Sequence, residues 1–525
     1  MHWIPPMALE RLLKSLLALP GNRRGNVAMI FSLALIPVTL LSGGAVDLSQ
    51  AMSARSRLAQ ALDAAALAVG VNASLSNDDA LGIANDFIAA NYPGREIGSV
   101  QNVTVTIDDE TDTVTVAGEA RVTTTLLGLA GIEHITVHWE SEVQRARQRL
   151  ELVMVLDNTG SMGGSKIRSL RDSAELLTQI LFEAADEAGD VHVGLVPFAA
   201  TVNVGTQYER AWWLDPDGLS PQHAEWVGPG GVAEVETCTG WGWRRRCTTE
   251  EIEVNHWDLF DRMRYAEWEG CVEARAIPYD IDDTVPAAGN PASLFVPYFA
   301  PDEPDIGRYS NSYLNDGTGG GVNERLINIS KYDGATANSR YPNRSCTTTP
   351  ITPLTANRRT VENAIGDMDA NGTTNIPNGI GWGIRVISPG EPFTQGTSWD
   401  DEEVVKAMVI LTDGQNVMSG RNTDLKSDYE AYGYARDRRL GVNSSSGNVL
   451  SRELDERTEA ACAEAKRLGI RVYTITFQVS SSSTRDMMRA CASNPSLYFD
   501  SPSSEALEDA FEMIAGDLTN LRLSR

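Results

Sequence analysis

The sequence has few of the side chains that bind soft metals, with only six histidines and six cysteines in 525 residues. No cysteine lies before residue 200 and no C-x-x-C spacing has histidines nearby, which excludes the common zinc-binding patterns. Positive charge is also scarce, because 44 lysines and arginines face 71 aspartates and glutamates, for a net charge of −27. This excess of acid excludes nucleic acid as a partner for the bulk of the chain.

One segment lacks charge altogether. Asn26–Val46 has no charged residue over 21 positions, and about 20 apolar residues suffice to span a bilayer. Basic residues precede this segment, so the N-terminus is predicted to lie inside. A cleaved signal peptide is the alternative, but an alanine-rich helical pattern continues from Asp47 to Val69 without a clear cleavage site. We therefore predict a retained transmembrane signal anchor at 26–46, preceded by a cytoplasmic basic tip at 1–25.

A phosphate-binding loop is absent from the most glycine-rich strand-to-helix connection. Gly160–Gly164 spans too few residues, and Ser165 stands where the lysine of G-x-x-x-x-G-K should follow. The apolar run Leu152–Leu156 before this loop predicts a strand buried on both faces, as in the middle of a parallel sheet. The spacing of apolar residues over 167–182 predicts a helix after it. The loop thus lies at the carboxyl end of a buried strand, where open α/β sheets bind ligands.

This loop offers oxygen ligands at alternate positions, namely Asp157, Thr159 and Ser161. One carboxylate and two hydroxyls, without thiolate or imidazole, suit Mg²⁺, Mn²⁺ or Ca²⁺ better than zinc or copper. One carboxylate cannot hold such an ion, so other segments must contribute oxygens. Thr374 precedes a second helical stretch, with Thr373 as an alternative ligand beside it. Asp413 follows a second buried strand at 406–411.

The pattern resembles the metal-ion-dependent adhesion site of von Willebrand factor A domains. Carried over residue by residue, the resemblance implies metal ligands at Asp157, Thr159, Ser161, Thr374 and Asp413. In that family the hydroxyls contact the metal directly and the two aspartates act mostly through water. Thr159 departs from the usual serine but keeps the hydroxyl. The expected cofactor is a divalent cation, Mg²⁺ first, with Mn²⁺ or Ca²⁺ as alternatives.

The remaining pattern predicts the domain organisation. Strands and helices alternate from residue 150 onward, which predicts an α/β fold with a doubly wound, mostly parallel sheet of the von Willebrand factor A type. We assign this domain to 147–525, with a large disulfide-rich insertion at about 200–350. Residues 47–146 are predicted to form a pilin-like helix and a small α+β spacer.

The insertion holds seven of the eleven tryptophans and four of the six cysteines. The tryptophans predict either a recognition surface, because exposed aromatic residues dominate binding hot spots, or the core of a segment poor in strands. A short acidic run at 280–283 favours a solvated turn over a calcium site. Six cysteines allow 15 pairings, and our hypothesis is Cys238–Cys247, Cys271–Cys346 and Cys462–Cys491, in an oxidising compartment.

Several segments together resemble the TadG-like proteins of bacterial tight-adherence (Flp) pilus-assembly systems. They are the apolar and alanine-rich residues 25–68, VLDNTGSM at 155–162, GCVEAR at 270–275, TNIPNGIGWGIRVISP at 374–389 and ILTDGQN at 410–416. The resemblance implies a single-pass protein of the bacterial inner membrane, with its bulk in the periplasm. It implies a role in pilus assembly or surface attachment and no enzyme activity.

Three functions remain in competition at the metal site. The first is binding of a protein partner that offers a carboxylate, such as a pilus-assembly component or a surface ligand. The second is a metal-dependent hydrolase using the same ion, for which no histidine or glutamate within the three site segments is available as a general base. The third is a metal-free A domain that acts as a scaffold.

Overall fold

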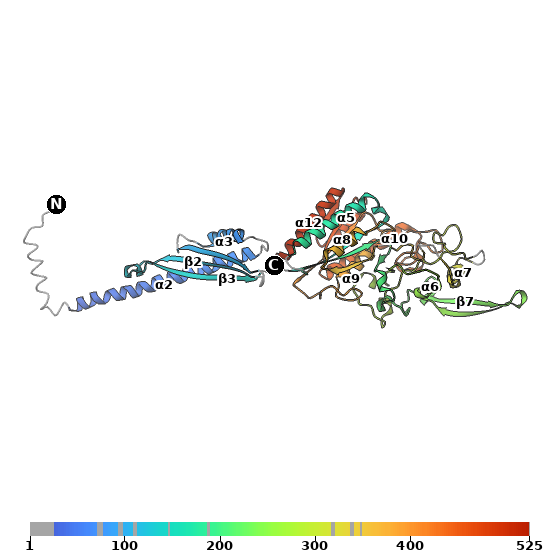
Figure 1. The fold of residues 1–525 in the computed structure, drawn as a ribbon, viewed down its shortest axis with the longest axis horizontal. Coiled ribbons are helices and arrows are strands. Elements are labelled where there is room, and N and C mark those ends of the chain that lie inside the picture. Colours follow the sequence, from blue (N-terminus) through green and yellow to red (C-terminus); the bar gives the residue numbers. More distant parts are fainter. Residues whose placement is uncertain are drawn as a thin grey trace, which may run out of the picture. The chain divides into compact units, whose positions relative to one another are not determined.

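The computed structural model describes residues 26–70, 77–92, 98–108, 113–144, 148–185, 189–316, 321–336, 341–346 and 349–523. The predicted basic tip at 1–25 lies outside these ranges. The chain forms two compact units, one of residues 1–147 with 523–525, the other of residues 148–522 (Figure 1). The predicted α/β fold class, with an apolar helix near the N-terminus and disulfide bonds, is confirmed.

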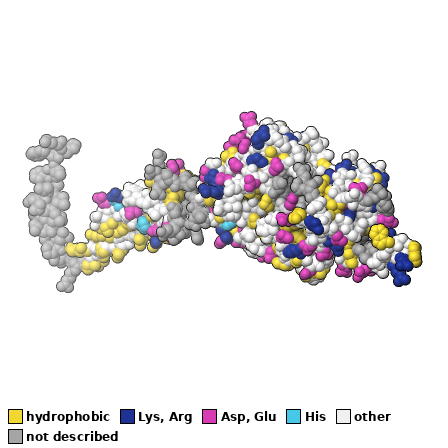
Figure 2. Space-filling model, turned by 45° about the vertical axis from the view of Figure 1, so that its right-hand side comes forward, with side chains coloured by type: hydrophobic (Ala, Val, Ile, Leu, Met, Phe, Trp, Pro, Cys, Tyr) yellow, Lys and Arg dark blue, Asp and Glu magenta, His cyan; other side chains and the backbone are white. Residues whose placement is uncertain are grey.

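The first unit is built around one long helix, α2 (Asn26–Gly70), which continues through Pro37. Among the described residues, α2 is the one helix that is long and apolar enough to cross a membrane. Its first part carries exposed apolar side chains, from Val27 (77% exposed) to Leu41 (76%) (Figure 2). The apolar first part of α2 is thus not covered by the other described residues of its unit.

The second half of α2 packs against a small sheet. Helix α3 (Asn77–Asn91) and the antiparallel strands β1 (Ser99–Asp108), β2 (Thr113–Thr123) and β3 (His134–Gln144) complete this unit. Burial alternates along β2, so that one face of the sheet meets the helices while the other does not. The core contains Leu58, Leu62 and Val69 of α2 together with Ala84 and Ile88 of α3.

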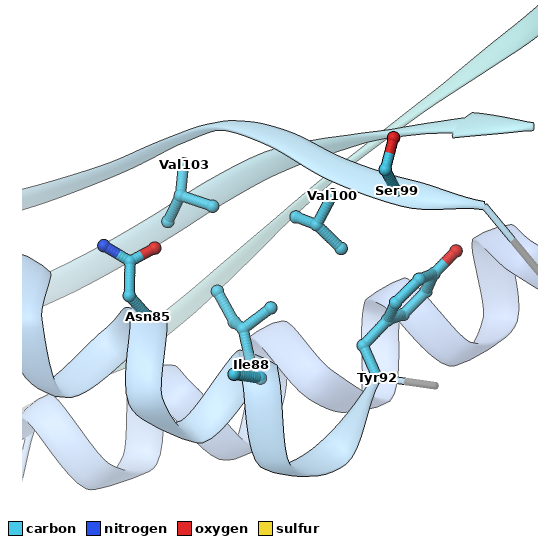
Figure 3. Close-up of a pocket in the computed structure, with 7 residues that line it drawn as sticks. Asn85, Ile88, Tyr92, Ser99, Val100 and Val103 are labelled. Carbon is cyan, nitrogen blue, oxygen red and sulfur yellow. The ribbon is translucent and has the colours of Figure 1, made fainter. Parts of the chain in front are cut away.

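A cavity of about 350 Å³ lies between α3 and β1. Ile88 of α3 and Tyr92, the residue directly after α3, face Val100 and Val103 of β1 across this space (Figure 3). Nothing in its lining identifies a ligand.

The second unit contains an eight-stranded sheet in the order β13-β12-β11-β4-β5-β6-β9, with β10 paired to β5. The strands are β4 (Arg149–Asp157), β5 (Val191–Phe198), β6 (Val202–Asn203), β9 (Cys271–Val272), β10 (Thr352–Thr355), β11 (Val404–Thr412), β12 (Arg471–Phe477) and β13 (Tyr498–Ser501). The five strands from β13 to β5 are parallel, whereas β6, β9 and β10 pair antiparallel.

Both faces of this sheet are buried. In β4, Leu152, Met154 and Leu156 enter one apolar cluster, while Val153 and Val155 enter the other. This is the side-chain alternation of a strand between two layers. The flanking helices are α5 (Ser165–Glu183), α8 (Arg358–Gly366), α9 (Ile376–Ile387), α10 (Gly447–Arg467), α11 (Ser482–Cys491) and α12 (Ser504–Leu523). The continuous apolar run of β4 reflects this double burial.

Residues 200–350 hold the short helices α6 (His256–Arg262) and α7 (Val322–Ile327) and the hairpin of β7 (Val232–Thr239) and β8 (Arg246–Glu253). The hairpin extends away from the rest of its unit (Figure 1). The structure divides these tryptophans between the core and the surface. Trp213, Trp226, Trp257 and Trp268 are at most 3% exposed and fill the core, whereas Trp212, Trp241 and Trp243 are exposed.

Two predicted disulfides are confirmed. Cys271 bonds to Cys346 and joins β9 to a later loop. Cys462 bonds to Cys491 and joins α10 to α11. Cys247 is also disulfide-bonded. In the register of β7 and β8 it lies directly opposite Cys238, its partner in the third predicted pair.

Candidate metal centre

Asp157 ends β4 with its side chain fully buried. Its Oδ1 accepts a hydrogen bond of 2.8 Å from the backbone N–H of Thr159, which folds the loop back on the strand end. Its Oδ2 accepts a hydrogen bond of 2.7 Å from the hydroxyl of Thr412, the last residue of β11. The carboxylate is therefore held from two sides, by its own loop and by the neighbouring parallel strand.

The two loop hydroxyls connect this strand end to Asp413. Thr159 Oγ1 lies 2.9 Å from Ser161 Oγ, and Ser161 Oγ donates to Asp413 Oδ1 at 2.6 Å. Asp413 directly follows β11, which pairs in parallel with β4 so that Leu411 lies opposite Leu156. Because neighbouring parallel strands end at the same edge of the sheet, the register itself brings the two predicted aspartates together.

The third predicted segment also reaches this edge. The N–H of Gly160 donates to Gly372 O at 3.0 Å, and the N–H of Val417 donates to Thr374 O at 2.8 Å. Gly372 has a φ of +84°, a left-handed conformation that favours glycine and turns the chain into the threonines. The loop therefore contacts both the segment after β4 and the segment after β11.

The two threonines of this loop have different surroundings. The Thr373 hydroxyl donates to Glu430 Oε1 at 2.9 Å, so it is committed to a carboxyl group outside the predicted ligand set. Thr374 is 4% exposed. This contact of Thr373 favours Thr374 as the predicted ligand.

A lysine that the sequence analysis did not single out also belongs to the site. Lys166 lies in the first turn of α5, and its Nζ is 2.7 Å from Asp413 Oδ2. Its side chain is 24% exposed, whereas the Asp413 side chain is fully buried. Its place five residues after Ser161, at the start of the helix that leaves the loop, is the signal that could have identified it.

The electrostatics of the site favour an added cation. Burial and, after it, the negative charge of Asp413 raise the pKa of Asp157 to about 6, against hydrogen bonds from Thr159 and Thr412 that lower it. Two buried carboxylates with one ammonium group leave one negative charge without a counter-charge when both are ionised. A cation bound between them would restore the ionised form of Asp157.

The available donors fit a hard cation. Among the described residues, no group of three or more histidine, cysteine, aspartate or glutamate side chains is placed to hold a metal ion. Any ion at this edge would therefore combine two carboxylates with hydroxyl oxygens and water. That donor set is typical of Mg²⁺ and related hard cations.

A cavity of about 350 Å³ adjoins the threonine loop and is lined in part by Gly372, Thr373 and Glu430. Burial raises the pKa of Glu430 to about 8, although the hydrogen bond from Thr373 lowers it. This carboxyl group is therefore largely protonated at neutral pH.

The acidic run at 280–283 is not a solvated turn. Asp280 is 1% exposed and pairs with Arg457 and the Tyr432 hydroxyl. Asp282 pairs with Arg275 at 3.0 Å. The sequence prediction failed because Arg457, the partner of Asp280, comes from a segment 177 residues away. These ion pairs also occupy oxygens that a calcium ion would need.

Residues 25–73 match the family model "Tad: Putative Flp pilus-assembly TadE/G-like". The resemblance to TadG-like proteins is thereby confirmed for the N-terminal segment. The chain matches no curated protein at a significant level.

Several solved structures are distantly similar. The pilus adhesin SpaC from Lactobacillus rhamnosus GG shares 13% identity, with 80% of this chain and 34% of that chain covered and a TM-score of 0.33. The vWF domain of the type V pili tip protein Mfa5 from Porphyromonas gingivalis shares 10%, with 72% and 97% covered and a TM-score of 0.35. The PilB minor pilin from Streptococcus sanguinis shares 12%, with 81% and 79% covered and a TM-score of 0.32. The chain spans about a third of the length of SpaC. At these scores the likenesses carry no functional inference.

Proposed function

We propose that this protein is a membrane-anchored binding and assembly component of a tight-adherence (Flp) pilus system. Residues 147–525 would form a doubly wound von Willebrand factor A-type domain with an insertion at about 200–350. This domain would bind an acidic group of a protein partner through a divalent cation. Support comes from the family match at residues 25–73 and from the convergence of Asp157 and Asp413 at one sheet edge.

The residues proposed to hold the ion are Asp157, Thr159, Ser161, Thr374 and Asp413. When bound, the cation would supply positive charge and a coordination position for a carboxylate. The chain's own contribution is to fix the oxygens before the partner arrives. Asp157 is held by Thr159 and Thr412, and Asp413 is held by Ser161 and Lys166.

The single observation that carries the proposal is the hydrogen-bonded series from Thr159 through Ser161 to Asp413. These three side chains come from two segments about 250 residues apart in the sequence. A glycine-rich turn that only capped a helix would not need its hydroxyls directed at a distant carboxylate. The series is the reason to prefer a metal site over a metal-free scaffold.

The hydrolase alternative is less well supported. Such a mechanism needs a general base that is ionised near pH 7. Glu430 is the carboxyl group held by the threonine loop, but its pKa of about 8 keeps it largely protonated there. We therefore propose no catalytic residue.

The proposed location is the bacterial inner membrane, with α2 as a single-pass anchor, the N-terminus in the cytoplasm and the bulk in the periplasm. The partner would be a pilus-assembly component or a surface ligand. The apolar and exposed start of α2 supports the anchor.

The test is calorimetric titration of the full-length protein in lipid nanodiscs with Mg²⁺, Mn²⁺ and Ca²⁺, with Asp157→Asn beside it. Asparagine keeps the size of the side chain and an acceptor oxygen but removes the charge, so the fold should survive. Asp509→Asn, an exposed carboxylate on α12, is the matched control. We expect Asp157→Asn to abolish both cation binding and pilus-dependent surface attachment in cells. Retention of both by this variant would overturn the proposal.

A further inference from the structure

The turn between β2 and β3 is hydrogen-bonded to α2 just after the exposed apolar segment of that helix, residues 27–42, ends. The turn contains the 3₁₀ segment η3 (Leu127–Ala130), which has no side-chain cap of its own. Asp47 of α2 supplies one. Its Oδ1 accepts from the N–H of Thr125 at 2.9 Å, and its Oδ2 accepts from the N–H groups of Leu126 and Leu127 at 2.9 and 2.8 Å.

Two glycines let the turn approach the helix closely. A Cβ added at Gly43 would lie 2.5 Å from Leu126 Cβ, a separation that real side chains do not show. A Cβ added at Gly44 would lie 3.2 Å from Leu127 Cδ2, which is tight but can be relieved by a rotation of that side chain. The turn is therefore fixed at one level of α2, between Gly43 and Asp47.

That level coincides with the expected edge of a bilayer. The 16 residues from Val27 to Ser42 are almost all exposed and span about 24 Å at 1.5 Å per residue. The hydrocarbon core of a bilayer is about 30 Å thick. The missing distance of about 6 Å corresponds to roughly four further residues, which are Gly43 to Val46. The segment of α2 that contacts the turn is thus needed to complete the span.

The turn itself has the chemistry of a segment that meets lipid. Residues 125–132 (TLLGLAGI) contain no charge, and Leu129 and Ile132 are 78% and 49% exposed. Within the turn, the N–H groups of Leu129, Gly131 and Ile132 donate to carbonyl oxygens of the same turn. At the edge of the hydrocarbon region, backbone polar groups without a partner in the protein are costly. Asp47 accepts hydrogen bonds from three further N–H groups of the turn.

We propose that this turn rests in the outer leaflet of the membrane that α2 spans, with Leu129 and Ile132 among the lipid chains near the headgroups. The proposal deepens the proposed membrane anchor and depends on it. A lipid surface is favoured as the occupant because apolar side chains are exposed both on the turn and on the part of α2 that holds it, where Val46, Leu48 and Met52 are also more than half exposed. Asp47 then acts as a fixed acceptor at the membrane edge that holds the turn at this depth.

The experiment uses the full-length protein in nanodiscs of phosphatidylethanolamine and phosphatidylglycerol at 3:1. A photo-crosslinking benzoylphenylalanine replaces Leu129 in one variant, Leu35 in the apolar span in a second, and Thr136 on β3 in a third. We expect lipid adducts from the first two positions and none from the third. Adducts at Leu35 without adducts at Leu129 would overturn the proposal for the turn and leave the anchor intact. Absence of adducts at Leu35 would instead overturn the anchor.

A second pair of variants tests the fastening. In the Leu129 crosslinker background, Gly43→Ala should displace the turn and reduce its lipid adducts at least threefold, whereas Gly44→Ala should change them much less. Crosslinking of Leu129 to a second copy of the chain, in place of lipid, would show that protein covers this surface and would overturn the proposal. Equal adduct yields in both glycine variants would exclude the proposed role of Gly43.

Discussion

The ammonium group of Lys166 lies 2.7 Å from Oδ2 of Asp413, on the carboxylate whose other oxygen accepts from Ser161. The lysine thus places a positive charge beside a carboxylate that is a proposed metal ligand. Because its side chain is partly exposed, it can turn toward solvent when another cation binds. The site therefore holds a built-in competitor for a divalent ion.

Replacement of this lysine should strengthen cation binding. We expect Lys166→Met to raise the affinity for Mg²⁺ about tenfold, or about 1.4 kcal/mol, because it removes a like charge from the site. Calorimetry on the full-length protein measures the change. Lys166→Arg keeps the charge and should bind Mg²⁺ as the unmodified protein does. Weaker binding by Lys166→Met would mean that the lysine orients Asp413 for the ion.

The two adjacent threonines should behave differently. Thr374→Ala removes a proposed ligand and should weaken Mg²⁺ binding by about 10- to 100-fold, or roughly 1.4–2.8 kcal/mol. Thr373→Ala removes the hydrogen bond to Glu430 and should leave the Mg²⁺ affinity within about twofold, a difference of roughly 0.4 kcal/mol. Titration of both variants side by side measures this contrast. The reverse order would reassign the ligand to Thr373.

Cation binding should weaken in acid. The pKa of Asp157 is about 6 in the folded protein, above its ordinary value, so a proton competes with the ion below that pH. For this one group, Mg²⁺ affinity should be about tenfold lower at pH 5 than at pH 7. Titrations at both values test it, and Asp509→Asn should show the same dependence. A flat profile would contradict the role of Asp157.

The raised pKa of Asp157 should make the metal-free protein more stable in acid, whereas it weakens cation binding there. A carboxyl group whose folded pKa is raised binds more protons in the folded state than in the unfolded state between about pH 4 and 6. Its contribution to stability is therefore largest in acid and is lost as the pH rises through about 6. Thermal unfolding in chelator should show this contribution for the unmodified protein and not for Asp157→Asn. If both proteins respond alike to pH, another group is responsible.

Loss of either confirmed disulfide should destabilise the second unit. Cys462–Cys491 closes a loop with a sequence separation of 29, and Cys271–Cys346 one of 75. In the chain-entropy model their removal costs about 3.6 and 4.5 kcal/mol. Thermal unfolding of the alanine double variants should give a lower Tm for both, with the larger fall for Cys271→Ala/Cys346→Ala. The opposite order would show that native contacts rather than loop length set the cost.

Local pattern was sufficient for much of this molecule. The uncharged run at 26–46 predicted an apolar helix, and the run before Asp157 predicted a strand buried on both faces. The hypothesis that Cys462 pairs with Cys491 was also correct. Such predictions succeed because periodicity and local turn chemistry depend on neighbouring residues alone.

Contacts between distant segments were harder to predict. The short strand β10 pairs antiparallel with β5, a strand that lies more than 150 residues earlier in the sequence. The split between buried and exposed tryptophans at 200–350 depends on which of them other segments cover. Three polar pairs could not be predicted because their members lie far apart in the sequence. They are Lys166 with Asp413, Thr373 with Glu430, and Arg457 with Asp280.

The sequence by itself determined which oxygen-bearing residues follow β4 and β11 and that an apolar helix lies near the N-terminus. Only the tertiary structure decided that Ser161 bonds to Asp413, that Thr373 turns to Glu430 and that Asp47 caps a turn nearly 80 residues away. The physical reason is that residue type and spacing fix local conformation. The pairing of a buried polar group, by contrast, is set by strand register and by the loops that packing brings against it.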